Sequence, residues 1–232
     1  MGTVWRIRDM NLHRLLAMKI IQDNRSVTDK ERLNFIEEAQ ISAQLQHPGI
    51  IPVHDLGTLA DGNLYFTMRE IKGRTLRDVM KSVHRASQDG IWRPAADGWN
   101  FRRLIASFHS VCETMAYAHS KGVIHRDLKP SNVMIGDYGE VLVVDWGIAK
   151  VIPKHKGDGF KVETSRAKFN IKESRGLVVG TPAYMAPEQA QGLDDQIDER
   201  SDVYCLGAML YRILAGQNAY QGNSVEVILH AK

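Results

Sequence analysis

Short runs of apolar residues, interrupted by turn residues, fill the first third of the chain and predict strands. The predicted strands are 2–8, where the alternation is weak, 15–21, 50–56 and 63–69. A helix is predicted between 15–21 and 50–56, from Thr28 to about Gln46, because acidic residues open it and a His-Pro-Gly sequence ends it. This part of the chain therefore indicates a small sheet with one helix.

The spacing becomes helical beyond residue 72. Apolar residues recur every three or four positions from Phe101 to Ala116, which is typical of an amphipathic helix. A shorter helix is predicted over 76–83, followed by a loop over 84–100. The apolar run 203–215 is shorter than the roughly 20 residues that span a bilayer, so we predict a buried helix there.

The two patterns together predict an α+β protein with two lobes. The first lobe, 1–71, is a small antiparallel sheet with its helix, and the second, 72–232, is larger and mainly helical. Each lobe is expected to bury its own apolar side chains, with a cleft between them.

Composition adds few constraints. The chain has 232 residues, of which 44% are apolar and 25% charged, as in ordinary soluble proteins. A net charge of +3 is too small to indicate a nucleic-acid partner. The two cysteines lie in apolar helical patterns and predict buried reduced thiols, which favours a cytoplasmic location. We expect no membrane segment in this chain.

Residues 125–132 read His-Arg-Asp-Leu-Lys-Pro-Ser-Asn and carry the clearest chemistry. Phosphoryl transfer needs a carboxylate to orient the attacking hydroxyl, a cation to hold the phosphate and an oxygen ligand for a magnesium ion. Asp127, Lys129 and Asn132 supply these groups on one loop. The alternative is an ordinary polar loop, but so many fixed identities in one short segment count against it.

This segment resembles the catalytic loop of bacterial eukaryotic-like Ser/Thr protein kinases, and the resemblance covers nearly all of the chain. It implies the two-lobed protein kinase fold. Asp145-Trp146-Gly147, which begins thirteen positions after Asn132, resembles the Asp-Phe-Gly element, with Trp in place of Phe. The resemblance implies that Asn132 and Asp145 bind Mg²⁺ on the phosphates of ATP.

Ala17-Met18-Lys19 resembles the third-strand lysine motif of these kinases. A single lysine in a strand is usually a solvated edge residue, but the helix that follows carries Glu37-Glu38-Ala39. The resemblance implies that Lys19 holds the α- and β-phosphates and pairs with Glu38 rather than Glu37.

Residues 180–188 resemble the substrate-binding loop with its closing Ala-Pro-Glu. The resemblance implies that Thr181 hydrogen-bonds Asp127 and Lys129, which favours Ser/Thr over Tyr substrates. It also implies that Asp202, at the start of a buried helix, holds the backbone of the catalytic loop.

An adenine site is implied as well. Met68 resembles the gatekeeper residue, and backbone groups of Arg69 and Ile71 are expected to hydrogen-bond the base. Simple core packing is the alternative interpretation for the apolar members. The residues implied to contact ATP are Gly2, Val4, Ala17, Lys19, Met68, Arg69, Ile71, Met134 and Asp145.

Arg126, directly before Asp127, indicates a kinase that is switched by an anion in the loop after Asp145. Ser174, Thr164 and Ser165 are candidate phosphosites. We expect Ser174 to be phosphorylated in trans, which implies self-association. The basic residues between 150 and 168 are interpreted as a solvated loop, with docking of acidic substrates as the alternative.

Both ends depart from the family pattern. Gly2 matches only the third glycine of the phosphate-covering loop, and Glu188 is expected to be unpaired because its usual arginine has no counterpart. We therefore expect a truncated kinase with low turnover. An ATP-binding pseudokinase or scaffold and a small-molecule kinase are the alternatives; the segment 180–188 counts against the latter.

Overall fold

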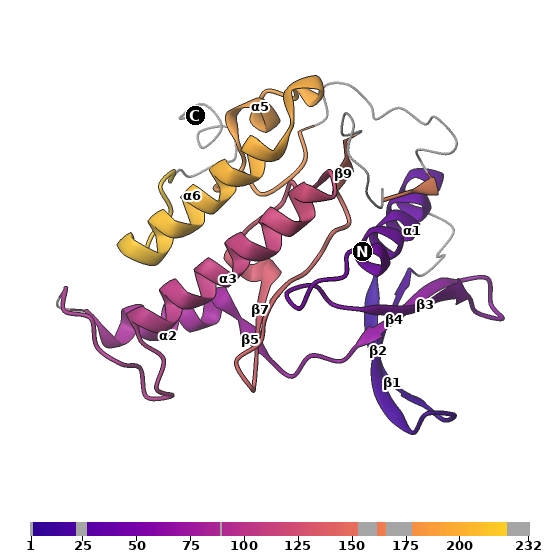
Figure 1. Ribbon diagram of the computed structural model, residues 1–232, viewed down its shortest axis with the longest axis horizontal. Helices are drawn as coiled ribbons and strands as arrows, with labels where there is room; N and C mark the ends of the chain where they lie inside the picture. Colours follow the sequence, from indigo (N-terminus) through magenta and orange to yellow (C-terminus); the bar gives the residue numbers. More distant parts are fainter. Residues whose placement is uncertain (1, 22–26, 89, 153–161, 166–177, 222–232) are drawn as a thin grey trace.

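The computed structural model describes residues 2–21, 27–88, 90–152, 162–165 and 178–221. A four-stranded antiparallel sheet with the order β1-β2-β4-β3 comes first, with helix α1 beside it (Figure 1). These elements are β1 (Thr3–Asp9), β2 (Arg14–Ile21), α1 (Asp29–Gln44), β3 (Val53–Thr58) and β4 (Leu64–Arg69).

Helix α1 begins where the sequence predicts. Thr28 accepts a hydrogen bond from the backbone N–H of Glu31, whose carboxylate accepts one from the backbone N–H of Thr28 at 2.8 Å. This reciprocal cap satisfies two N–H groups that a helix start leaves without intrahelical partners. The helix packs on the sheet through Phe35 and Ala39, which form a small core with Phe66 of β4.

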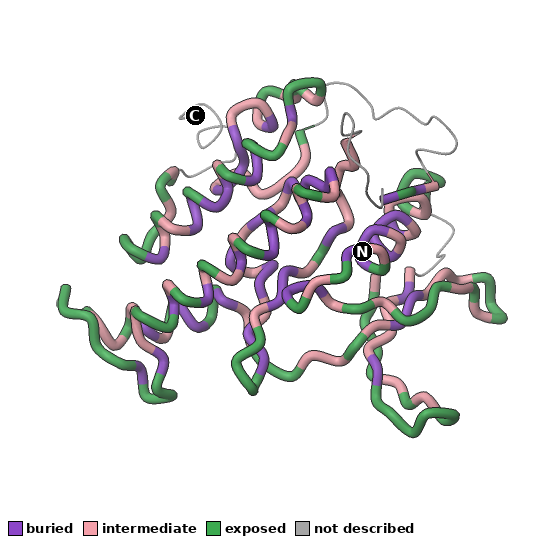
Figure 2. Tube along the Cα trace, viewed as in Figure 1, coloured by how far each residue is buried: buried purple, intermediate pink, exposed green. Residues whose placement is uncertain are grey.

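Helices dominate the rest of the described chain, together with a three-stranded sheet β5-β7-β8 and the strand pair β6-β9. The largest buried cluster joins α2, α3 and α6, and buried positions recur along these helices (Figure 2). The elements are β5 (Gly73–Thr75), α2 (Leu76–Ala86), α3 (Phe101–Ser120), β6 (Val123–Ile124), η1 (Pro130–Asn132), β7 (Val133–Gly136), β8 (Val141–Val143), β9 (Lys150–Val151), α5 (Pro187–Ala190), η2 (Asp194–Gln196) and α6 (Glu199–Ala215).

The α+β class is confirmed, whereas two predicted boundaries are wrong. The strand predicted from residue 50 begins at Val53, because Ile50 forms an isolated bridge with Val143 of β8 instead. Helix α2 runs past residue 83 to Ala86, and His84 within it lies 2.9 Å from the carbonyl oxygen of Ile213. Among the described residues, no helix has the length and apolar character that crossing a membrane requires. The boundary at 71/72 stays a prediction.

Candidate active site

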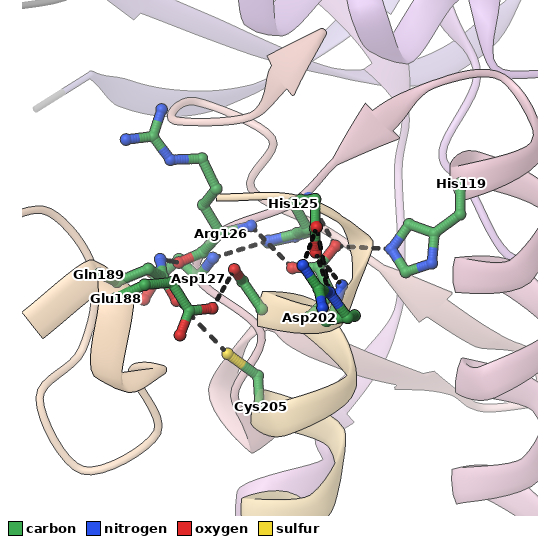
Figure 3. A network of polar contacts seen from close by, with 11 residues as sticks. His119, His125, Arg126, Asp127, Glu188, Gln189, Asp202 and Cys205 are labelled. Carbon is green, nitrogen blue, oxygen red and sulfur yellow. Dashed lines mark hydrogen bonds and ion pairs between the residues drawn. The ribbon is translucent and has the colours of Figure 1, made fainter. Parts of the chain in front are cut away.

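The backbone of the catalytic loop is held by one buried carboxylate. Asp202, in the first turn of α6, has no exposed surface and accepts hydrogen bonds from the N–H groups of His125 at 2.8 Å and Arg126 at 2.9 Å. Nε2 of His119 lies 2.8 Å from the same carboxylate (Figure 3). Hydrogen bonds to a carboxylate are strong, so the loop is anchored to α6, and His119 of α3 contacts the same carboxylate.

Two residues of the site have an unfavourable backbone conformation. Arg126 has φ = 70° and Asp145 has φ = 69°, both in the left-handed region that residues other than glycine rarely adopt. Such conformations cost free energy and persist only where surrounding contacts hold them. Arg126 directly precedes Asp127, and Asp145 is itself a predicted magnesium ligand.

Three predicted catalytic side chains meet around one carboxylate. Thr181 donates its hydroxyl to Oδ1 of Asp127 at 2.7 Å, and Nζ of Lys129 lies 2.5 Å from Oδ2 of Asp127 and 2.8 Å from the Thr181 hydroxyl. Nδ2 of Asn132 donates to the Asp127 carbonyl at 3.0 Å and to Oδ2 at 3.2 Å. The Asp127 carboxylate is therefore fixed in direction.

A glycine permits the approach of Thr181 to the catalytic loop. Gly180 has φ = 128°, and a Cβ atom at this position would lie only 3.1 Å from the carbonyl oxygen of Arg126. A larger residue would therefore be strained in its backbone and crowded against the loop.

A second charged pair joins the sheet to α1. Nζ of Lys19 in β2 lies 2.5 and 2.7 Å from the two carboxylate oxygens of Glu38. Burial raises the pKa of the Glu38 carboxyl; the Lys19 ammonium lowers this pKa, and the negative charge of Asp145 raises it further. A Cβ atom on Gly147 would lie 3.2 Å from Oε2 of Glu38, so the segment with Asp145 packs against this pair.

Trp146 directly follows Asp145 in the chain. Its side chain is buried and packs against the ring of His125, with 4.7 Å between centroids. Its indole N–H donates to the carbonyl oxygen of Val143 at 3.3 Å. The tryptophan side chain is thus buried in the core, and its one polar group, the indole N–H, has a hydrogen-bond acceptor.

The strand register brings most of the predicted adenine residues together. Ala17 of β2 pairs directly with Met68 of β4, and Val4 of β1 pairs with Lys19. Arg69 ends β4, Ile71 follows it, and Gly2 precedes β1. Met134 lies on β7, opposite Thr75 of β5.

Comparison with known proteins agrees with this geometry. The protein kinase domain family matches residues 1–231. The chain belongs to the protein kinases. It is 36% identical to the serine/threonine-protein kinase PknD of Protochlamydia amoebophila over 97% of its length, and 37% identical to PknD of Chlamydia trachomatis serovar L2b over 92%. The chain spans about a quarter (23%) of the length of both relatives.

Within the part of this kinase that the structure describes, Arg126 contacts a carboxylate. Nη2 of Arg126 lies 3.3 Å from Oδ1 of Asp194, and Nζ of Lys150 lies 3.2 Å from Oδ2 of the same residue. Ser174 lies outside the described residues. Thr164 is buried, and the Ser165 hydroxyl accepts a hydrogen bond from Gln40 at 2.8 Å.

Glu188 accepts a hydrogen bond from the hydroxyl of Ser201 in α6. The expectation that it has no arginine partner stays a prediction. The neighbouring Gln189 donates to the carbonyl oxygen of Arg126 at 2.8 Å. Figure 3 shows both residues beside the catalytic loop. Sequence reasoning missed Gln189, Ser201 and Asp194, since these common polar residues belong to no spacing pattern.

Proposed function

We propose that this kinase transfers the γ-phosphoryl group of ATP to serine and threonine hydroxyls of protein substrates. The observation that carries the proposal is the contact of Lys129 and Thr181 with the Asp127 carboxylate. A carboxylate held in one direction can orient a substrate hydroxyl and accept its proton. The adjacent ammonium stabilises charge on the phosphoryl group as it moves.

The Lys19–Glu38 pair supports phosphate binding. The Lys19 side chain is 20% exposed, so its ammonium can reach the phosphates while Glu38 fixes its direction. The contact with both carboxylate oxygens of Glu38 therefore directs the Lys19 ammonium that would bind the phosphates.

The residues present suit a magnesium ion as well. Asn132 uses Nδ2 for both of its hydrogen bonds to Asp127, which leaves Oδ1 as the ligand atom, and Asp145 would add a carboxylate. No group of three or more His, Cys, Asp or Glu side chains within the described ranges could hold a metal. Mg²⁺ commonly binds through one or two protein oxygens together with phosphate and water, where it neutralises phosphate charge.

The contact of Thr181 with Asp127 also supports the choice of substrate. It places the loop that would carry a substrate peptide directly beside the carboxylate, within reach of a short side chain. The two relatives above are named serine/threonine-protein kinases, which agrees with this choice.

The test is transfer of labelled phosphate from ATP to a protein substrate, followed by phosphoamino-acid analysis. We expect phosphoserine and phosphothreonine, and a loss of all transfer in Asp127→Asn. ATP binding without transfer by the unaltered chain would instead select the scaffold function. Phosphotyrosine as the main product would overturn the substrate assignment.

Two wider proposals concern partners and location. Ser174 would be phosphorylated by a second copy of the chain. In a mixture of active kinase and tagged Asp127→Asn chain, mass spectrometry would then detect phosphate on Ser174 of the tagged chain.

A cytoplasmic location agrees with Cys112 and Cys205, which form no disulfide.

A further inference from the structure

Two glutamines of α1 hold a segment more than a hundred residues away in the sequence. Gln44 donates Nε2–H to the carbonyl of Glu163 at 2.8 Å and accepts the Glu163 N–H at 3.0 Å. Gln40 accepts the Ser165 N–H at 2.9 Å and donates to the Ser165 hydroxyl at 2.8 Å. In Figure 1 this short orange segment, 162–165, lies beside α1.

The two glutamines lie one turn apart on α1. Residues four apart on a helix are separated by about 6 Å along its axis and lie on the same side of it. Gln40 and Gln44 can therefore contact Ser165 and Glu163 at the same time. Thr164 between them is 4% exposed, and Val162 joins the large apolar core, so the segment is fixed on two sides.

The contact requires the chemistry of glutamine. A side-chain amide offers a donor and an acceptor, which match the C=O and N–H of one residue in an extended chain. Glutamate would keep the acceptor and lose the donor. Gln44 thus recognises the backbone of Glu163, and Gln40 recognises the N–H and the hydroxyl of Ser165.

We propose that Gln40 and Gln44 are positioning residues for the Lys19–Glu38 pair, a role that rests on the proposed kinase function. Phe35 and Ala39 hold α1 to the sheet, and the two glutamines hold it to the segment 163–165. Glu38 lies on the same helix, two positions before Gln40. Loss of the glutamine contacts frees α1 to shift, and Glu38 then leaves Lys19.

The experiment compares the unaltered chain with Gln40→Ala, Gln44→Ala and the double variant. We expect kcat to fall about tenfold in the double variant, since about four hydrogen bonds of modest net strength are lost. Gln44→Glu should give an intermediate loss. The matched control is Gln46→Ala, an exposed residue just beyond α1, which should leave kcat unchanged.

Two further measurements separate positioning from general destabilisation. In a Glu38→Gln background the double glutamine change should lower kcat no further, because both act through Lys19. Amide hydrogen exchange at Glu163 and Ser165 should become faster in the double variant while its unfolding midpoint stays close to that of the unaltered chain.

Unchanged kcat in the double variant, or an additional tenfold loss in the Glu38→Gln background, would overturn the proposal. Unchanged exchange at Glu163 and Ser165 would also overturn it. A chain without any transferase activity would contradict the proposed function instead, and the exchange measurement would still test the contact.

Discussion

Thr181 donates its hydroxyl to Asp127 across 2.7 Å, although 54 positions separate the two residues. The same hydroxyl accepts a hydrogen bond from Lys129. One side chain of the substrate loop thus orders the carboxylate and the ammonium that the proposed reaction uses. The catalytic loop and the substrate loop form a single polar unit.

Thr181→Val keeps the shape of this side chain and removes the hydroxyl. We expect kcat to fall roughly 10- to 100-fold with little change in the KM for ATP, because Asp127 loses one of its fixed partners. Thr181→Ser should retain most activity. Steady-state kinetics of the three proteins would test this, and equal rates for valine and threonine would contradict it.

Asp202→Asn should destabilise the chain. The variant loses the negative charge and presents an amide NH₂ to N–H donors in a site without exposure. We expect the free energy of unfolding in urea to fall by about 3 kcal/mol. Asp137→Asn, on the exposed turn between β7 and β8, is the control and should change it little. A loss of equal size in both variants would argue against the anchor.

Stability should depend on pH through Glu38. The pKa of the Glu38 carboxyl is raised above its ordinary value of 4.5, which applies in the unfolded chain. The folded chain therefore binds the carboxyl proton more tightly than the unfolded chain does. The stabilising contribution is complete below pH 4.5 and is lost as the pH rises through the raised value. The unfolding free energy of the unaltered chain minus that of Glu38→Gln should therefore decrease from pH 4.5 towards neutrality. Urea titrations at several pH values would measure this difference, and an increase would contradict the burial argument.

Asp194 should act through Arg126. Asp194→Asn removes the carboxylate that contacts both Arg126 and Lys150. We expect the activity of phosphatase-treated protein to fall about fivefold, which corresponds to a rise of roughly 1 kcal/mol in the activation free energy. Arg126→Ala should cause a similar loss, and the double variant no more than either single one. Additive losses would show that the two residues work independently.

The sequence alone was sufficient for the chemistry and the class of fold. The catalytic loop, the Asp145 element and Lys19 each lie in a short segment with its own chemical identity, so they can be recognised without knowledge of the fold. Helix α3 was predicted correctly because apolar spacing reports which side of a helix is buried. The end of α2 was misplaced, since His84 reaches a carbonyl of α6 that local spacing cannot reveal.

Only the tertiary structure decided how these groups are held. Gln40, Asp194 and Ser201 are polar residues that a local pattern interprets as solvated, and their partners lie far away in sequence or outside any motif. A hydrogen bond requires its two atoms to lie about 3 Å apart, and the partners of such bonds follow no regular spacing in the sequence. Only the folded structure therefore shows which polar residues are in contact. Apolar burial does leave a period in the sequence, because each helix or strand presents one side to the core.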